Sequence, residues 1–451
     1  MEAVETAFAG NGFQRGKRSL PARLKSPFSF FFRHVKKIGL AKSHGTFFRS
    51  MIAAGCGRRI DRPSLKQTGS RGDPIMAPFS VTNERFLLAA KLAASETSNT
   101  KSLSRAYHPA SLNSPVDCLV TGATGLVGNN VVRLLLGRGQ SVRAMVRSET
   151  TCHRALEGLR LQTAVGTLDN ERLVQQAVDG ASCVVHAAAM VHLGWRHLDE
   201  MRRANIEGTR TMARAARRAG AKFIHVSSVD AIGLRPDGAP ADEATPPGGL
   251  LECPYVITKR EAEAAVLSEV DQGLNAVIVN PVYMLGPWDW KPSSGRMLLE
   301  VGSGWGTFAP PGSNDFVDVR DVAEGILAAM DRGQSGRRYI LGGQPLSYFE
   351  AWRVFARVAG RMPPLGTARP VVVRTAGWCG DLASLCTRRE LPINSAATAM
   401  SMLSHHFSCA RAKAELGYTY RPFETTVSDA WNWFVDHSYA RPTRGRAVLA
   451  R

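Results

Sequence analysis

The stretch Val116-Asp-Cys-Leu-Val-Thr-Gly-Ala-Thr-Gly-Leu-Val-Gly128 decides the fold of this chain. Its first part, Val116 to Val120, is a short apolar run of the kind that forms a buried strand. The pattern from Gly125 to Leu136 then has the periodicity of a helix. A strand, a glycine-rich turn and a helix in immediate succession predict the first βα unit of a parallel sheet.

The three glycines of this turn have separate uses. Gly122 allows the tight turn, Gly125 lets a ligand approach the backbone without an intervening Cβ, and Gly128 lets the helix pack closely on the strand. An anion at this place meets free N–H groups and the positive end of the helix dipole. We therefore expect the turn to hold the pyrophosphate of a dinucleotide, with contacts from Gly122, Thr124, Gly125, Leu126, Val127 and Gly128.

Apolar strand-like runs and helical patterns keep alternating after this unit. Further strands are expected at 141–146, 161–165, 182–186, 222–226 and 275–279, and further helices at 171–178, 198–219 and 255–270. This alternation predicts an α/β fold with a Rossmann-type, doubly wound parallel sheet over residues 116–280. We expect residues 281–440 to form a smaller, mostly helical substrate-binding region, of which one helix and one strand join the Rossmann sheet.

Charge separates the ends of the chain from its centre. The 451 residues carry a formal net charge of +19, of which +13 falls within residues 1–115. We expect residues 1–115 to be a basic, disordered leader and residues 441–451 to be a basic tail. An organelle-targeting segment and a downstream translation start at Met51 or Met76 are alternatives that the sequence leaves open. Because the remainder is only mildly basic, we expect no nucleic-acid partner.

Cysteine usage and hydropathy indicate the compartment. The eight cysteines are scattered, without a CxxC pair or a Cys/His cluster at zinc spacing. Reduced thiols, a cytoplasmic location and no metal site are therefore expected. No apolar run approaches the roughly 18 residues that a membrane helix needs, so no membrane span is expected.

The end of the second strand indicates which dinucleotide binds. NAD-binding units place an acidic residue about 20 positions after the turn, where it binds the ribose hydroxyls. Here the segment Ser141-Val-Arg-Ala-Met-Val-Arg-Ser148 ends in Arg147 and offers no carboxylate. Arg147 can pair with a 2′-phosphate, so NADP is favoured over NAD.

A candidate catalytic set follows in the second half of the sheet. Tyr255 and Lys259 lie one helical turn apart, so both project from the same face of a helix. A nearby positive charge favours the phenolate, and we therefore expect Lys259 to lower the pKa of Tyr255. Ser228 ends the preceding strand, where its hydroxyl can bind a substrate oxygen beside Tyr255. Strand alternation favours Ser228 over its neighbour Ser227.

Taken together, these motifs resemble the extended branch of the short-chain dehydrogenase/reductase superfamily, the NAD-dependent epimerase/dehydratase family. The motifs that carry the resemblance are TGATGLVG from Thr121, HAAA from His186, NIEGT from Asn205, SSVDAIG from Ser227, YVITK from Tyr255 and NPVYMLGP from Asn280. They keep the order and approximate spacing of that family from Val116 to about His437. Within it, SVRAMVRS is similar to the dihydroflavonol-reductase and 3β-hydroxysteroid-dehydrogenase type.

The resemblance implies roles for individual residues. Ser228, Tyr255 and Lys259 would be the catalytic triad, and Asn205 would support the lysine through water. Residues implied to line the cofactor are Ala187, Ala188, Pro281 and Val282, together with Leu168 in a Thr-Leu pair where the family often has Asp-Leu.

One departure from the family narrows the reaction. Family dehydratases have an adjacent Asp-Glu pair after the serine or threonine position, whereas this chain has Val229-Asp230. A 4,6-dehydratase is therefore disfavoured. We expect an oxidoreductase that acts on a small-molecule carbonyl or secondary alcohol, and a homodimer is possible. The alternatives are a nucleotide-sugar 4-epimerase and, from another class, a non-catalytic NADP-sensing scaffold.

Overall fold

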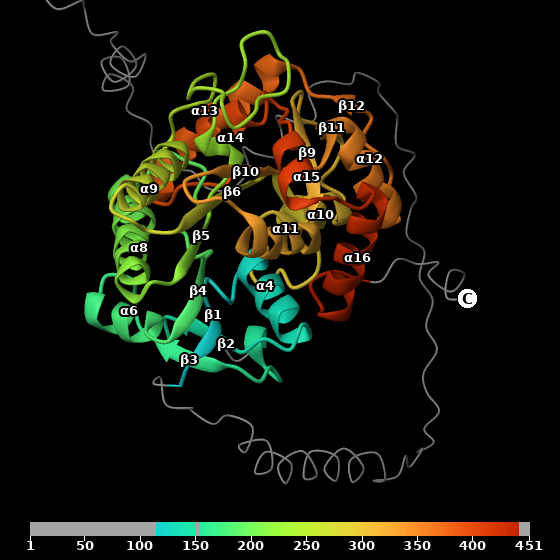
Figure 1. Cartoon of the computed structure of the whole chain (residues 1–451). Helices are drawn as coiled ribbons and strands as arrows, with labels where there is room; N and C mark the ends of the chain where they lie inside the picture. Colours follow the sequence, from blue (N-terminus) through green and yellow to red (C-terminus); the bar gives the residue numbers. More distant parts are fainter. Residues whose placement is uncertain (1–113, 149–153, 442–451) are drawn as a thin grey trace, which may run out of the picture. The chain divides into compact units, whose positions relative to one another are not determined.

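The structure is a computed structural model, and it describes residues 114–148 and 154–441 (Figure 1). Residues 1–113 of the expected leader and residues 442–451 of the expected tail lie outside the described residues. The disorder expected for these two segments therefore stays a prediction.

A seven-stranded parallel sheet forms the centre of the fold (Figure 1). Its order is β10-β6-β5-β4-β1-β2-β3, so the chain runs outward from β1 in one direction and then in the other. The strands are β1 (Val116–Thr121), β2 (Val142–Val146), β3 (Gln162–Val165), β4 (Ala181–His186), β5 (Lys222–Val226), β6 (Ala276–Pro281) and β10 (Arg338–Leu341). The predicted Rossmann-type sheet is confirmed.

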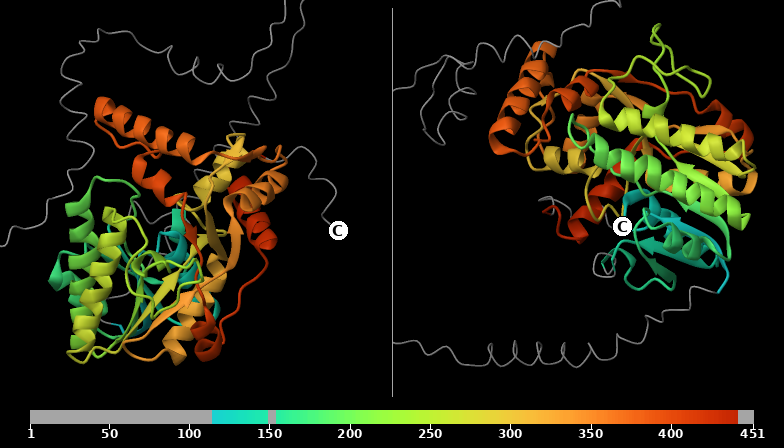
Figure 2. Two further views of the ribbon diagram at one scale, coloured as in Figure 1. Left: turned by 90° about the horizontal axis from the view of Figure 1, so that it is seen from above. Right: turned by 90° about the vertical axis from the view of Figure 1, so that its left-hand side faces the viewer.

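Helices cover both faces of this sheet (Figures 1 and 2). Helices α4 (Leu126–Gly137) and α11 (Val319–Arg332) pack on one face, and α6 (Glu171–Val178), α8 (Gly208–Ala219) and α9 (Pro254–Val270) pack on the other. The side chains of β1 alternate between two hydrophobic cores, one on each face of the sheet. Cys118 and Val120 belong to the core under α4 and α11, and Leu119 belongs to the core under α6, α8 and α9. A parallel sheet buried on both faces needs such continuous apolar strands.

The expected helix over 198–219 is divided into three parts. It consists of α7 (Leu198–Met201), a π-helical turn (Arg202–Glu207) and α8. A π-helical turn inserts one residue into the helical repeat and often marks a functional position. Here it contains Asn205, which the family resemblance had singled out.

The C-terminal region contains helices and a small second sheet. Its helices are α10 (Gly295–Gly302), α12 (Tyr348–Val358), α13 (Pro370–Thr387), α14 (Ser395–Met400), α15 (Ala410–Leu416) and α16 (Phe423–Asp436). The second sheet comprises β7 (Tyr283–Leu285), β9 (Ser313–Asp318), β11 (Gln344–Ser347) and β13 (Ser404–His405), and β8 (Phe308–Ala309) pairs with β12 (Gly366–Thr367). The sequence did not predict this sheet, because its strands are short and do not alternate clearly.

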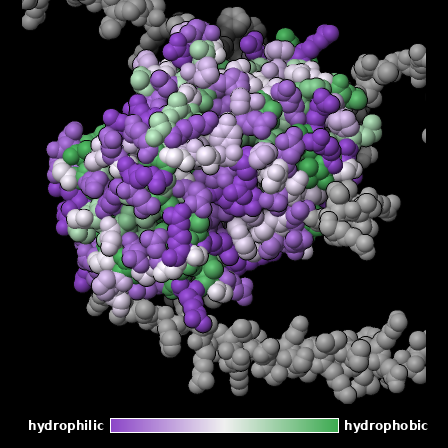
Figure 3. All heavy atoms as spheres, turned by 45° about the vertical axis from the view of Figure 1, so that its right-hand side comes forward, coloured by the Kyte–Doolittle hydropathy of each residue, from purple (hydrophilic) through white to green (hydrophobic). Residues whose placement is uncertain are grey.

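Most of the face in Figure 3 is hydrophilic, with small, separate hydrophobic patches. Two tryptophans in the loop after β7 contribute to the packing of the C-terminal region. Trp288 and Trp290 lie against Trp433 of α16, with ring centroids 6.1 and 5.0 Å from it.

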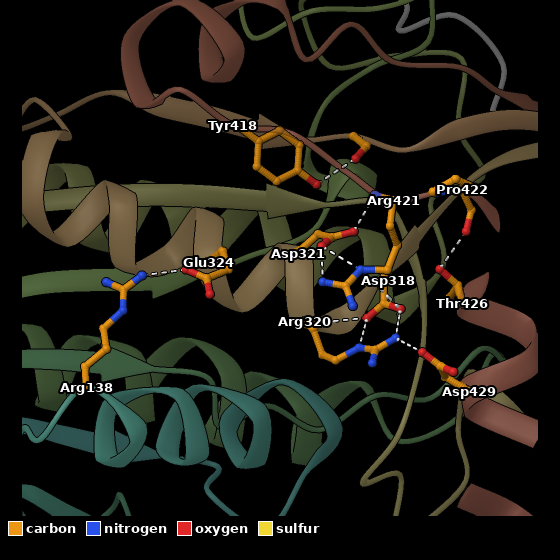
Figure 4. A network of polar contacts seen from close by, with 11 residues as sticks. Arg138, Asp318, Arg320, Asp321, Glu324, Tyr418, Arg421, Pro422, Thr426 and Asp429 are labelled. Atoms are coloured by element: carbon orange, nitrogen blue, oxygen red, sulfur yellow. Dashed lines mark hydrogen bonds and ion pairs between the residues drawn. The ribbon is translucent and has the colours of Figure 1, made fainter. Parts of the chain in front are cut away.

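An ion-pair network ties the C-terminal region to α11 (Figure 4). The buried carboxylate of Asp318 caps α11 by accepting from the Arg320 N–H at 2.8 Å, and it also accepts from the Arg320 guanidinium at 2.7 Å. The same guanidinium binds Asp429 of α16 at 2.6 Å. A second arginine, Arg421, binds Asp321 at 2.6 Å. Asp318 therefore combines a helix cap with a buried ion pair.

Replacing Asp318 should destabilise the fold much more than replacing its exposed counterpart. We expect Asp318→Ala to lower the free energy of unfolding by about 2–4 kcal/mol, because it removes a cap and leaves a guanidinium without its buried partner. Asp429→Ala is the matched control and should cost about 0–1 kcal/mol, because that carboxylate is partly exposed. Chemical denaturation of both variants measures the difference, and equal losses would contradict the role given to Asp318.

Candidate active site

The candidate site lies where the chain changes direction at the carboxyl edge of the sheet. Thr121 ends β1 and pairs in register with His186 at the end of β4. From β1 the chain continues into α4 on one face, whereas from β4 it continues into the helices on the other face. Open α/β sheets form their ligand crevice at such a switch point.

The turn after β1 is as tight as its sequence predicts. Gly122 has φ of +68°, and a Cβ there would lie 2.7 Å from the backbone of Ala187 and Ala188. A Cβ on Gly128 would lie 2.3 Å from the carbonyl oxygen of Gly122. Neither position can therefore accept a side chain, and α4 packs directly on the turn.

Gly125 differs from these two glycines because the space that a Cβ would occupy is largely empty. A Cβ there would meet only the Gly122 oxygen, at 3.3 Å, and Gly125 itself is exposed. It is the N-cap of α4, and no side chain caps the helix. The remaining residues of the turn, Thr124, Leu126 and Val127, are half-buried around the same helix start. The start of α4 thus fits a pyrophosphate, which would accept from its free N–H groups.

The other candidate cofactor contacts surround this helix end. Arg147 follows β2, is exposed, and has no side-chain hydrogen bond or ion pair within residues 114–148 and 154–441. Leu168 follows β3 and packs against the core under α8. Ala187 and Ala188 are half-buried after β4, with their backbone against Gly122.

Pro281 and Val282 complete the edge of the sheet at the end of β6. Pro281 pairs in register with Leu341 of β10, and Val282 donates its N–H to the Leu341 carbonyl at 3.3 Å. The Val282 side chain is buried in the core. Only the backbone of Val282 can therefore contact a ligand above the sheet.

Two buried histidines lie at the switch point, and His186 links β1, β4 and α8 there. His186 Nδ1 lies 2.9 Å from the Thr121 hydroxyl and its Nε2 lies 3.0 Å from the Thr209 hydroxyl of α8. Burial lowers the pKa of His186 to about 3, and the Lys259 charge contributes to the shift. Its ring lies 5.8 Å from that of His225 on β5, whose pKa is also lowered by burial. Both rings are neutral at physiological pH.

Ser228 and Tyr255 come together at the end of β5. Ser228 caps a short 3₁₀ turn (Val229–Ala231), and its hydroxyl lies close enough to the phenol of Tyr255 to influence the pKa of that phenol. Burial and the Asp230 carboxylate raise the pKa of Tyr255, whereas the nearby Ser228 hydroxyl lowers it. Our expectation that Lys259 lowers this pKa is wrong for the isolated chain, because desolvation of the phenol outweighs the favourable contacts. At neutral pH the phenol keeps its proton.

Lys259 is buried one helical turn after Tyr255. Its Nζ donates to the carbonyls of Val226 at 3.3 Å and Ser227 at 3.5 Å. Burial lowers the pKa of Lys259 to about 8, although the carboxylates of Glu263 and Asp230 oppose the shift. The ammonium is therefore fixed against the end of β5 and close to losing its charge.

Asn205 lies beside this helix, and in the described part of the chain its side chain forms no direct hydrogen bond with Lys259. Its side chain accepts from the Met190 N–H at 2.7 Å and donates to the Met190 carbonyl at 2.9 Å. It also donates to the Thr258 hydroxyl at 3.2 Å. Asn205 thus fixes the segment after β4 against the helix that carries the catalytic candidates.

Two titratable residues that sequence reasoning did not place in the site lie next to the serine. Asp230 accepts from the Ser228 hydroxyl at 3.0 Å, and His405 of β13 places Nε2 4.0 Å from the Asp230 carboxylate. Asp230 could have been found, because it follows a capping serine by two residues. No sequence signal links His405 to the site, because a distant strand brings it there. Val229, by contrast, is buried in the core.

A chain of buried polar side chains supports α9, the helix that carries Tyr255 and Lys259. Asn280 of β6 donates to the Ser228 carbonyl at 2.8 Å and to the Glu263 carboxylate at 2.6 Å. Glu263 also binds Arg338 at 2.6 Å. This chain fixes the backbone of Ser228 relative to α9, and it was not predicted either.

The described residues offer neither a membrane span nor a metal cluster. No helix in residues 114–148 and 154–441 combines the length and apolarity that crossing a bilayer requires. Within the same ranges, no three His, Cys, Asp or Glu side chains gather as metal ligands would.

Comparison with known proteins agrees with this geometry. The model of the NAD dependent epimerase/dehydratase family matches residues 118–342. Sterol demethylase protein B of Methylococcus capsulatus is 33% identical over 320 residues, which is 70% of this chain and 97% of that protein. The 3-beta-hydroxysteroid dehydrogenase of Mycolicibacterium neoaurum is 29% identical over 68% of this chain and 87% of its own. The crystal structure of gox2253 is 36% identical, with a TM-score of 0.63, and covers 72% of this chain and 99% of that one.

This chain therefore belongs to the NAD-dependent epimerase/dehydratase family, within the extended short-chain dehydrogenases/reductases. It is an NAD(P)-dependent enzyme with a Rossmann fold, and its resemblance to the 3β-hydroxysteroid-dehydrogenase type is confirmed.

The turn after β1 can be tested by two alanine substitutions in the same helix. Gly128→Ala should weaken NADPH binding by at least about tenfold and destabilise the protein, because its Cβ would overlap the Gly122 backbone. Gly137→Ala is the matched control, because a Cβ there meets nothing within 4 Å. Fluorescence titration with NADPH and thermal unfolding measure both effects. If Gly128→Ala kept wild-type affinity, the close packing would not matter for binding.

The buried lysine predicts a particular dependence of stability on pH. The unfolded chain keeps its Lys259 proton up to the ordinary pKa of 10.5, whereas the folded protein releases it near pH 8. Folding is therefore favoured as pH rises through this window. Relative to Lys259→Met, the wild-type free energy of unfolding should rise by on the order of 3 kcal/mol between pH 8 and 10.5. Denaturant titrations at several pH values measure this difference, and a constant difference would contradict the assigned pKa.

Proposed function

We propose that this enzyme is an NADP(H)-dependent oxidoreductase that interconverts a carbonyl compound and a secondary alcohol. The observation that carries the proposal is the proximity of the Ser228 hydroxyl and the Tyr255 phenol at the carboxyl edge of the sheet, where the serine lowers the pKa of the tyrosine. Lys259 lies one helical turn away on the same helix. Two neighbouring hydroxyl groups are suited to binding a single substrate oxygen.

The residues around the turn fit a dinucleotide with a 2′-phosphate. The open side of Gly125 and the uncapped start of α4 would hold the pyrophosphate. Arg147 is exposed and has no competing partner in the described part of the chain, so its guanidinium can bind a phosphate. This supports NADP rather than NAD. The bound cofactor would supply or accept the hydride.

The residues of this chain handle the proton. In the substrate complex the Ser228 hydroxyl would turn from Asp230 to the carbonyl oxygen, so that Ser228 and Tyr255 both donate hydrogen bonds to this oxygen and polarise the carbonyl. As the carbonyl carbon gains a hydride, Tyr255 transfers its phenolic proton to the oxygen, and a proton from solvent then restores the phenol. Lys259 carries a positive charge below pH 8 and stabilises the phenolate that forms. A Tyr255 pKa above its usual range favours the reductive direction, because the acid must hold its proton.

An apolar surrounding favours a lipophilic substrate. Tyr255 packs against a cluster of buried apolar side chains that includes Leu250, Val256 and Met400. Burying apolar substrate surface against such side chains contributes about 25 cal/mol per Å². The similar proteins are named as a sterol demethylase protein and a hydroxysteroid dehydrogenase. We therefore infer an apolar cyclic ketone or alcohol as the substrate class.

Removing the phenolic hydroxyl should stop turnover without harming cofactor binding. We expect Tyr255→Phe to lower kcat by about 10²–10⁴-fold while NADPH affinity is retained. Tyr420→Phe is the control, because Tyr420 is a partly buried tyrosine whose ring packs against Tyr418 and Lys413 beside α15. Turnover is measured as NADPH oxidation with a panel of steroid and cyclic ketones, and full activity of Tyr255→Phe would end the proposal.

Cofactor choice is tested separately. Arg147→Ala should weaken NADPH binding about tenfold or more and leave NADH binding unchanged, because only NADPH carries the 2′-phosphate. Fluorescence titration with both cofactors measures the ratio. Equal affinities of the wild-type protein for NADPH and NADH would overturn the role of Arg147. Epimerisation of a nucleotide sugar without net cofactor consumption would instead favour the epimerase hypothesis.

A further inference from the structure

Helix α13 is oriented with its small residues inward and its large apolar residues outward. The residues buried against the protein are Gly377, Gly380 and Ser384. The opposite face carries Val371, Trp378, Leu382 and Leu385, which are 71, 65, 52 and 53% exposed. Their spacing of seven, four and three residues places them in one stripe along the helix. An ordinary surface helix has the reverse arrangement.

Close packing fixes this orientation. A Cβ on Gly377 would lie 2.2 Å from the Thr398 hydroxyl, and one on Gly380 would lie 1.8 Å from the Ile393 carbonyl oxygen. Rotation of α13 would bring larger side chains into these contacts. The apolar stripe therefore stays on the outside, and Figure 2 shows α13 (orange) at the edge of the molecule.

The charges around the stripe are positive. Arg369 precedes the helix, Arg374 lies beside the stripe, and Arg388 and Arg389 follow the helix, all of them exposed. The acidic residues of the same segment point inward. Asp381 accepts from the Ser395 N–H, and the Glu390 carboxylate binds the His192 ring at 2.6 Å and the Trp195 N–H at 2.8 Å.

Helix α14 connects α13 to the candidate site. Helix α14, on which α13 packs, contributes Ala396 and Met400 to the apolar cluster around Tyr255. The segment after β4 joins the same helix, because the Trp195 indole donates to the Ser395 hydroxyl at 2.7 Å. In that segment Val191 is 59% exposed. Exposed apolar side chains thus lie both on α13 and on the segment after β4 that contacts α14.

We propose that the apolar stripe of α13 docks on an anionic lipid surface. Apolar and tryptophan side chains with arginines at the flanks are the features by which an interfacial helix lies in the headgroup region. The long arginine side chains can reach lipid phosphates while the stripe is buried. An antiparallel pairing of two α13 helices, stripe against stripe, would instead bring Arg369 of each copy towards Arg388 and Arg389 of the other, and like charges oppose that contact. Docking on a lipid surface does not require catalysis. A negative result for docking therefore leaves the proposed reaction untouched, and the reverse also holds.

Vesicle co-sedimentation of the full chain tests the docking. We expect the wild type to sediment with phosphatidylcholine vesicles that contain phosphatidylglycerol, and more weakly with phosphatidylcholine alone. The triple variant Trp378→Ser/Leu382→Ser/Leu385→Ser should bind the anionic vesicles at least about tenfold more weakly, because it loses most of the buried apolar surface. Val165→Ser is the matched control, because Val165 is an exposed apolar residue on β3, at the far edge of the sheet.

A charge variant and a size measurement complete the test. Arg374→Glu/Arg388→Glu should weaken binding to anionic vesicles, whereas Arg218→Glu, on exposed α8 surface, should not. Residues 1–113 are present in every variant, so differences among variants report on α13. Wild-type binding by the triple variant would overturn the proposal. It would also be overturned if analytical ultracentrifugation showed a wild-type dimer that the triple variant loses while vesicle binding stays unchanged.

Discussion

The direct contact between helix α4 and the turn after β1 is the constraint on which the site depends. Gly122 and Gly128 leave no room for a side chain between the helix, the turn and the chain after β4. Because of this contact, the start of α4 faces the crevice with its N–H groups free. The same contact fixes the position of β1 relative to β4, and the buried bonds of His186 to Thr121 and Thr209 extend it to α8.

The catalytic candidates are held by a second set of buried polar contacts. Lys259 is fixed by two carbonyls at the end of β5, and Asn280 joins the Ser228 backbone to Glu263. Buried polar groups stabilise a structure only when they are paired, so these contacts restrict the positions that Ser228 and Lys259 can take. The site is thus preorganised by side chains that do not themselves touch a substrate.

Much of the Rossmann half could be predicted from the sequence because its signals are local. The glycines of the first turn, the apolar strands and the pair Tyr255 and Lys259 each lie within a few residues, and periodicity alone places them. The short strands β9 and β13 have no such period, since their pairing depends on segments that are distant in the chain. For that reason His405 was missed beside Asp230. The pKa of Tyr255 was also mispredicted, because burial is a property of the whole fold and the YxxxK spacing shows only the nearby charge.

Deuterium transfer tests most directly whether Ser228, Tyr255 and Lys259 serve carbonyl reduction. NADPH deuterated at the transferable C4 position would be incubated with the enzyme and a panel of steroid and cyclic ketones, and products analysed by mass spectrometry. We predict an alcohol that carries one deuterium at the former carbonyl carbon and an equal amount of NADP formed. No transfer to any ketone, together with isomerisation of a nucleotide sugar by retained cofactor, would contradict this account.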